Sequence, residues 1–220
     1  MVLAKRLAVA LTLLAVGLTV GGCKIVATAK RSTAASEETD GGAFDPSAKV
    51  REMWGAKVLP YLSAKAGPFP AVIALAAATP DTAGKKFGHR PAEGNVPWTF
   101  VATISGRIVA AETTSRAGTI SVDTEGDGKI AAIVQIGPAM RGTAIRDALD
   151  FVSFNDFKNQ IDYAQFGKAF NQFAVQTFLS NLPRDSLVAR HVTVLGAFAL
   201  DAGDQPPLVT PAQLTLGAPR

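Results

Sequence analysis

The chain has 220 residues, and its 22 Lys and Arg residues against 18 Asp and Glu residues give a formal charge of +4 at pH 7. Two basic residues, Lys5 and Arg6, lie in an N-terminal segment that we expect to be removed, which leaves the mature chain nearly neutral. Such a chain lacks the basic footprint of a nucleic-acid-binding protein. One cysteine excludes an intrachain disulfide, and two histidines are too few for the usual zinc ligand sets.

Residues 1–22 are typical of a secretion signal. The basic start is followed by the apolar run Leu7–Val20, which is shorter than the roughly 20 residues that span a bilayer as a helix. The run ends in Val20-Gly-Gly-Cys23, which resembles the lipobox of bacterial lipoproteins, with Val20 where Leu is usual. The resemblance implies that Cys23 carries a diacylglycerol and becomes the mature N-terminus. The alternative is an ordinary cleaved signal that leaves Cys23 free.

Residues 23–42 are expected to be a lipidated tether, because they are rich in Ser, Thr and charged residues and end in a Gly pair. We expect the covalent lipid to be the protein's only prosthetic group. The expected location is the periplasm, on a membrane. Lys24 follows the cysteine in place of the Asp that retains lipoproteins in the inner membrane of enteric bacteria, so the outer membrane is favoured.

Residues 43–97 predict a helical region. Asp45 and Pro46 are typical of a helix start, and apolar residues recur at helical spacing from Val50 to Leu62. Pro60 lies inside this pattern and should kink or end the helix. Further helices are expected over Pro70–Ala78 and from Pro80 to Phe87, followed by a loop. The loop is predicted to span 88–97, which contains two Gly and two Pro residues.

From residue 98 to residue 220, several stretches have apolar residues that recur with a period of two, which is typical of strands. Three strands, a helical insert over 141–182 that breaks near Val152, and two more strands are predicted. This order is that of an OB-fold, a five-stranded barrel with a helix between its third and fourth strands. The fold class is therefore α+β, mainly β, with a long insert and an N-terminal helical region. The strands are expected at 100–111, with a bulge at Gly106, and at 119–122, 130–136, 191–200 and 208–216.

The link from Asp123 to Lys129 carries Asp123, Glu125 and Asp127 at alternate positions, like the front of a calcium loop. A complete loop needs a bidentate Glu at its twelfth position, which is Val134 here. We therefore favour a hairpin turn, and a weak calcium site is the alternative.

If the protein binds a solute, the site is expected where the loop 88–97 approaches the insert. Arg side chains and helix N-termini bind carboxylates and phosphates, and Asn or Asp beside aromatic residues is common in sugar sites. We favour internal pairing instead: Arg146 with Asp147, Asp150 or Asp156, or Arg141 with Asp156, and His89 with a backbone carbonyl. The aromatic stripe from Tyr163 to Phe178 is more typical of a core. The candidate ligand-binding residues are His89, Arg90, Arg141, Arg146, Asn155 and Asp156.

Several stretches together resemble a bacterial family of predicted periplasmic lipoproteins, domain of unknown function 2291. They are Cys23–Val26, Phe44–Pro46, Trp54–Pro60, Phe87–Arg90, Ser115–Thr119, Asp123–Lys129, Gln135–Pro138, Arg141–Thr143 and Phe154–Phe157. The resemblance implies an OB-like fold, no established activity, and genes that lie beside those of sugar ABC transporters.

The leading hypothesis is a membrane-tethered, non-enzymatic module that binds a protein or a small solute near a sugar importer. No catalytic residue is predicted, because the usual hydrolase and metalloprotease motifs are missing from the sequence. One alternative is a carbohydrate hydrolase that uses carboxylates such as Asp147, Asp150 and Asp156. The other is a purely structural envelope protein. The sequence predicts no oligomeric state.

Overall fold

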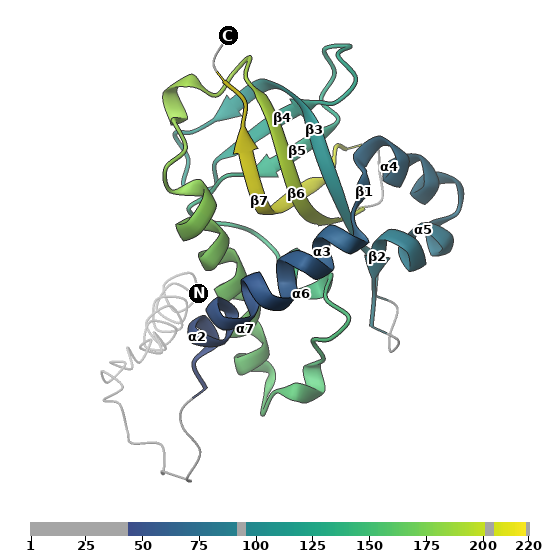
Figure 1. Cartoon of the computed structure of the whole chain (residues 1–220), viewed down its shortest axis with the longest axis vertical. Helices are drawn as coiled ribbons and strands as arrows, with labels where there is room; N and C mark the ends of the chain where they lie inside the picture. The colour runs from purple at the N-terminus through teal and green to yellow at the C-terminus, as the bar shows by residue number, and fades with distance from the viewer. Residues whose placement is uncertain (1–43, 92–95, 201–204, 219–220) are drawn as a thin grey trace, which may run out of the picture. The chain divides into compact units, whose positions relative to one another are not determined.

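The computed structural model describes residues 44–91, 96–200 and 205–218, and all that follows concerns these ranges (Figure 1). The predicted signal, Cys23 and the tether lie outside them. The described residues belong to one compact unit that begins at Ala43.

The N-terminal helices start where the sequence predicts. α2 (Pro46–Met53) is capped by the Asp45 carboxylate, which accepts hydrogen bonds from the backbone N–H groups of Ser47 and Ala48. Pro60 does not end the helical run, which continues to Lys65. The π-helical turn η1 (Trp54–Val58) precedes it, the N–H of Leu59 bonds to the Trp54 carbonyl, and α3 (Leu59–Lys65) follows directly. The wider turn relieves the clash that a proline ring makes with the preceding turn.

Two more helices follow, α4 (Phe69–Ala78) and α5 (Pro80–Phe87), at the predicted places. Two short strands beside them were not predicted. β1 (Gly67–Pro68) pairs parallel with the barrel, and β2 (Gly88–His89) pairs antiparallel with it. The predicted loop 88–97 therefore begins as a strand.

Five strands form a closed barrel, as predicted. They are β3 (Thr99–Glu112), β4 (Thr119–Asp123), β5 (Ala132–Gln135), β6 (His191–Ala199) and β7 (Leu208–Leu216). Their order around the barrel is β3-β4-β5-β7-β6, and β6 pairs back with β3 along its whole length. Only the β5–β7 pairing within this barrel is parallel.

The bulge in β3 does not lie at Gly106. The register shifts between Ile108 and Ala110, so Val109 is the extra residue. Gly106 instead allows a close approach, since a Cβ atom there would lie 2.2 Å from the Asp123 carbonyl oxygen.

The insert between β5 and β6 is less helical than predicted. Its helices are α6 (Ala144–Asp147), the 3-10 turn η2 (Phe154–Asp156), α7 (Gln160–Ala174) and the π turn η3 (Val175–Leu179); the short η4 (Arg184–Ser186) follows. Thr143 precedes α6, but its side chain does not cap the helix. The break predicted near Val152 therefore extends over most of the stretch between α6 and α7.

Two hydrophobic cores share the same strands. The barrel core takes the inward residues of β3, Phe100, Ala102, Ile104 and Ile108, and is covered at one end by α4 and α5. The second core, called the helical layer here, packs α2, η1, α3, α6 and α7 on the outer face of the barrel. The barrel contributes Val101, Leu195, Ala197 and Ala212 to it. In Figure 1 α7 runs beside α2, below the barrel.

The aromatic stripe of α7 lies in the helical layer, as expected of a core stripe. Phe166 and Phe170 are fully buried. Trp54 packs on Phe170 and Phe173 with ring centroids 6.0 and 4.7 Å apart. The stripe thus fixes α7 against the N-terminal helix as well as against the barrel.

Candidate functional site

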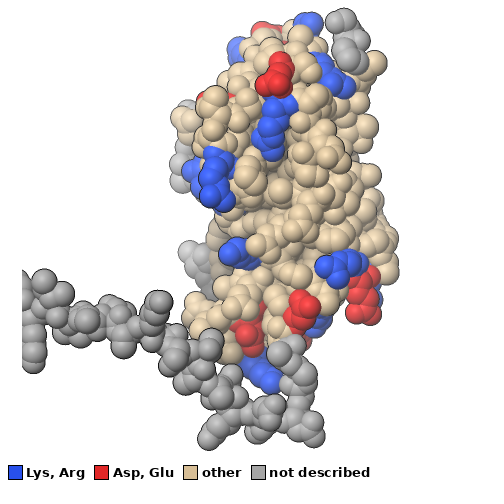
Figure 2. Space-filling view, turned by 90° about the vertical axis from the view of Figure 1, so that its left-hand side faces the viewer, with Lys and Arg blue, Asp and Glu red and all other residues tan. Residues whose placement is uncertain are grey.

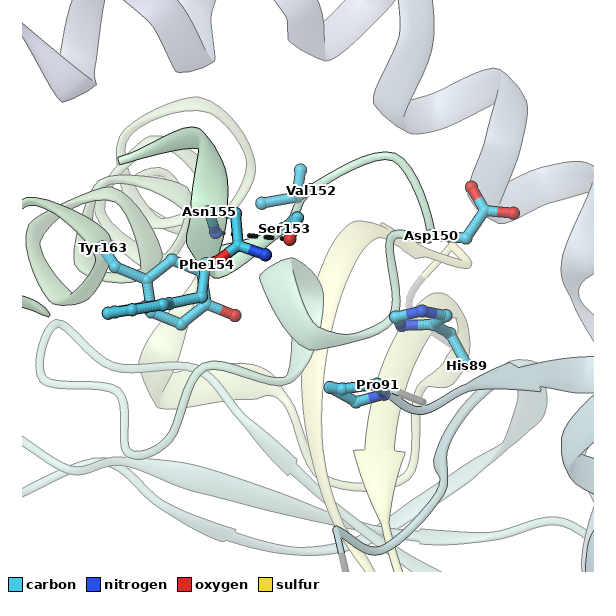
Figure 3. A pocket seen from close by; sticks show the side chains of 8 residues that line it. All are labelled: His89, Pro91, Asp150, Val152, Ser153, Phe154, Asn155 and Tyr163. Atoms are coloured by element: carbon cyan, nitrogen blue, oxygen red, sulfur yellow. Dashed lines mark hydrogen bonds between the residues drawn. The ribbon is translucent and has the colours of Figure 1, made fainter. Parts of the chain in front are cut away.

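Two adjoining hollows lie between the end of β2 and the insert, with volumes of about 300 and 620 Å³. Both are lined by His89, Pro91, Val152, Phe154 and Tyr163, and we call them together the His89 hollow (Figure 3). The smaller part adds Asp150, Ser153 and Asn155; the larger adds Val96, Pro97, Thr99, Arg146, Asp147, Gln160 and Ala199. The predicted loop and the insert therefore do meet.

His89 is placed by its backbone pairing. Gly88 pairs with Phe100, and a Cβ atom at Gly88 would lie 2.6 Å from the Thr99 carbonyl oxygen, so only glycine lets β2 approach β3 this closely. His89 Nδ1 lies 2.9 Å from the backbone carbonyl oxygen of Asp147. A carbonyl only accepts, so Nδ1 carries the hydrogen, and the Nε2 atom of the neutral ring is an acceptor. The predicted contact of His89 with a backbone carbonyl is confirmed.

Arg146 is a buried internal clamp. Its Nη2 atom lies 2.6 Å from Asp147 Oδ1, and its Nε donates to the same oxygen at 2.8 Å. It also donates to the Tyr163 carbonyl and the Thr143 hydroxyl, and its guanidinium lies 3.7 Å from the centre of the Tyr163 ring. Its partner is Asp147, one of the predicted choices, and not Asp156. With four of its five N–H donors engaged, Arg146 supports the wall of the hollow and has little left for a ligand.

Three other candidates do not reach the hollow. Arg90 pairs with Asp81 at 3.3 Å and stacks on Trp98, whose indole N–H donates to the same Asp81 carboxylate. Arg141 is exposed and lines neither part. Asp156 caps the η2 turn, where its Oδ2 accepts from the Ser153 N–H at 2.9 Å. The predicted convergence of six residues is thus reduced to His89, Arg146 and Asn155.

The aromatic wall was missed from the sequence as part of a site. Phe154 is 50 % exposed and meets the Tyr163 ring edge to face, with centroids 5.4 Å apart. Desolvation by burial raises the pKa of the Tyr163 hydroxyl, so that it stays a neutral donor at physiological pH. Tyr163 belongs to the aromatic stripe that the sequence predicts to be core, so its position in the wall of the hollow was not predicted. An exposed Phe beside Asn155 in a turn is the signal that could have identified the wall.

The Asp123–Lys129 link forms a tight turn. Asp123 Oδ1 accepts from the N–H groups of Glu125 and Gly126, and Oδ2 accepts from Gly128. The hydrogen bond from Gly128 is the largest cause that lowers the pKa of Asp123. Asp127 pairs with Lys129. Because the backbone already uses both oxygens of Asp123, the geometry supports the hairpin turn over a calcium loop. In the described ranges no three His, Cys, Asp or Glu residues are grouped to hold a metal ion.

Comparisons with known proteins agree with this architecture. A family model described as "Predicted periplasmic lipoprotein (DUF2291)" matches residues 13–215. An OB-fold protein of known structure from Thermotoga maritima is 19 % identical with a TM-score of 0.64, covering 80 % of this chain and 99 % of its own.

An OBody bound to hen egg-white lysozyme is 15 % identical, with 60 % of this chain and 94 % of its own covered and a TM-score of 0.27. No curated protein matches. None of the described helices has the length and apolar character needed to cross a bilayer.

Proposed function

Because the chain belongs to the family of predicted periplasmic lipoproteins (DUF2291), we propose that it is a lipid-anchored binding module of the periplasm. Its ligand is a neutral, sugar-like solute held in the His89 hollow. The observation that carries the proposal is the lining: an exposed aromatic wall beside uncharged hydrogen-bonding groups. Phe154 offers a flat apolar surface, while Asn155, Ser153 and His89 Nε2 offer donors and acceptors.

The charges of the lining favour a neutral ligand over an anionic one. The positive charge of Arg146 is paired with Asp147, and Asp150 adds a carboxylate at the edge of the smaller part. An anion in the hollow would face these carboxylates without a free cation among the described lining residues. A polyol would meet no such repulsion.

Binding rather than hydrolysis is proposed for a geometric reason. A glycosidase needs two carboxyl groups that flank one bond. Asp147 is held by Arg146 and by the Thr143 hydroxyl at 2.6 Å, and Asp156 is held in its cap. Asp147 and Asp150 line the hollow, and Asp147 is neutralised by Arg146, so a single carboxylate is left, which does not make the pair.

The anchor and the partner complete the proposal. We propose that Cys23 is acylated after removal of residues 1–22, and that the protein lies on the outer membrane near a sugar importer, as Lys24 and the gene neighbourhood in the family suggest. The variant Cys23→Ser should accumulate as uncleaved precursor without bound lipid. Normally processed, membrane-bound Cys23→Ser protein would contradict the anchor. Fractionation of the two membranes tests the location.

Solute binding is tested by calorimetry on the mature chain with neutral monosaccharides and with their phosphate esters. We expect a neutral sugar to bind, and Phe154→Ala or Asn155→Ala to weaken it about tenfold, the loss of about 1.4 kcal/mol that one good contact contributes. The control is Gln213→Ala, an exposed amide in a separate hollow on β6 and β7. Binding of the phosphate ester alone would show that the hollow is an anion site.

A further inference from the structure

The large hydrophobic residues that are exposed in the described structure are Val96, Ile130, Phe151, Phe154, Ile161 and Val188. Phe154 and Val96 line the His89 hollow, and Phe151 and Ile161 directly follow the lining residues Asp150 and Gln160. We call Val96, Phe151, Phe154 and Ile161 the apolar rim. Ile161 is 67 % exposed, and the hollow on its surface is lined by Gln160, Ala164, Gln165 and Lys168.

The first described residue of the folded unit lies near the apolar rim. Phe44, the first described residue, lies 5.6 Å from Phe157 between ring centroids. Phe157 lies 5.3 Å from Tyr163, which in turn contacts Phe154 of the rim. A continuous row of aromatic contacts therefore links the start of the folded unit to the rim.

Covalent geometry limits the distance between Phe44 and the membrane. The chain from Cys23 to Phe44 spans at most about 75 Å even if fully extended. An acylated Cys23 therefore limits how far Phe44 can move from the bilayer. Under such tethering a weak contact is enough to hold the rim on the bilayer, because the tether gives the rim a high local concentration at the membrane surface.

We propose that the apolar rim docks on the bilayer that holds the Cys23 lipid, with Ile161 entering the headgroup region. The inference rests on the lipid anchor of the proposed function. Aromatic and aliphatic side chains bind at this interface through burial of apolar area. Exposed charges near the rim have both signs, Lys158 and Lys168 beside Asp156, and the lower end of the face in Figure 2 shows both colours. Docking therefore depends on apolar contact rather than on anionic lipid.

The test uses the lipidated full chain in vesicles of phosphatidylethanolamine and phosphatidylglycerol. Cys23 is the only cysteine and its thiol is acylated, so an introduced cysteine can be labelled alone. A polarity-sensitive fluorophore is placed at Ile161→Cys. The matched control is Val188→Cys, which is 55 % exposed and precedes the first residue of β6, whereas the hollow contains the last residue, Ala199. The two ends of this nine-residue strand lie about 27 Å apart, so Val188 lies near the end of β6 that is far from the hollow.

We expect the label at 161 to emit at shorter wavelength and to be quenched by nitroxide-bearing lipids, and the label at 188 to behave as in water. A second probe at Lys158→Cys should lose its shift when Ile161 is replaced by Ser, with the melting temperature unchanged. Vesicle-bound protein with a water-exposed label at 161 would overturn the docking alone. Failure of the chain to float with vesicles would overturn the anchor and the docking together.

Discussion

The barrel core and the helical layer are built on the same strands but differ in composition and in polar pairing. The barrel core is mainly aliphatic, with Ile104, Ile108 and Ile120 fully buried, whereas the layer packs Trp54, Phe166 and Phe170. Trp54 Nε1 and Asn171 Oδ1 are buried without a hydrogen-bond partner among the described residues. Both come from helices of the layer. An unpaired buried polar group costs about 1–3 kcal/mol, so these two groups weaken the layer.

This difference explains where the candidate site lies. A closed barrel with paired strands leaves little freedom for a ligand, while the layer includes the irregular stretch 148–159 and the exposed turn η2. The rigid sheet positions His89 through β2, and the layer supplies Phe154, Asn155 and Tyr163. The site thus combines one fixed wall with one adaptable wall.

The largest effect is expected in the barrel. Phe198 is fully buried between Phe69 and Phe100, and Phe198→Ala should lower the free energy of unfolding by about 3–5 kcal/mol through lost burial and a cavity. Urea denaturation measures this. The same change at the half-exposed Phe154 is the control and should cost less than about 1 kcal/mol. Equal losses would mean that the burial of Phe198 contributes little to the stability of the barrel.

In the helical layer, Arg146→Ala should cost about 3 kcal/mol. This is the lower end for breaking a buried ion pair, because the Asp147 side chain is 32 % exposed. The control Arg141→Ala removes an exposed arginine of the same insert and should change stability by no more than about 0.5 kcal/mol. A stable Arg146→Ala protein that had lost solute binding would show that Arg146 faces the ligand instead.

A smaller loss is expected at the contact between α6 and α7. A Cβ atom at Gly167 would lie 2.6 Å from Thr143 Cγ2 and 2.9 Å from Arg146 Nη1, so Gly167→Ala should destabilise by about 1–2 kcal/mol after its gain in helix propensity. Gly55→Ala is the control, since nothing lies within 4 Å of its Cβ position. We expect Gly55→Ala to leave the melting temperature unchanged or raised. A rise at both positions would show that α6 is free to shift.

The Asp123 turn predicts a pH dependence. Hydrogen bonds from the backbone, that of Gly128 first, lower the folded-state pKa of Asp123, so its contribution to stability is present above the unfolded pKa of about 3.9 and is lost as pH falls through the folded value. Asp123→Ala should therefore lower the melting temperature at pH 7, and the gap to the native chain should narrow towards pH 3. Glu125→Ala serves as the exposed control. A gap that is independent of pH would contradict the ionised cap.

The smallest effect is expected from calcium. If the link is only a turn, millimolar calcium should leave the melting temperature unchanged within about a degree. A true site would add about 2.7 kcal/mol at a hundredfold excess over Kd, which is several degrees for a domain of this size. A shift of several degrees that disappears in Asp127→Ala would identify a metal loop.

The parts of the fold that follow from local patterns were predictable. The alternation of residue types along β3 and β6 predicts the ends of these strands to within a residue or two, because burial determines which residue types occur on each face of a strand. The two-residue strands β1 and β2 were not predictable, since their pairing partners lie far along the chain. The insert was predicted as too helical, because Phe151, Phe154 and Phe157 of the irregular stretch also recur at the three-residue spacing of a helix.

The candidate site was predictable as a place but not as a set of side chains. The chain order brings the segment after α5 to the insert, so His89, Arg146 and Asn155 lie at one hollow. The side chains of neighbouring residues make contacts outside the hollow: Arg90 stacks on Trp98, and Asp156 caps a turn. The direction of each side chain depends on local backbone angles, which the spacing of residue types does not determine.

The barrel strands contribute residues to both hydrophobic cores, and this limits how the protein can be shortened. Val101, Leu195, Ala197 and Ala212 turn apolar groups to the outside of the barrel, where the helical layer covers them. A truncated protein that begins after α3 would expose this stripe on its sheet, and such a surface invites aggregation. A soluble, lipid-free version for crystallisation should therefore start at about residue 43 and keep α2, α3 and α7.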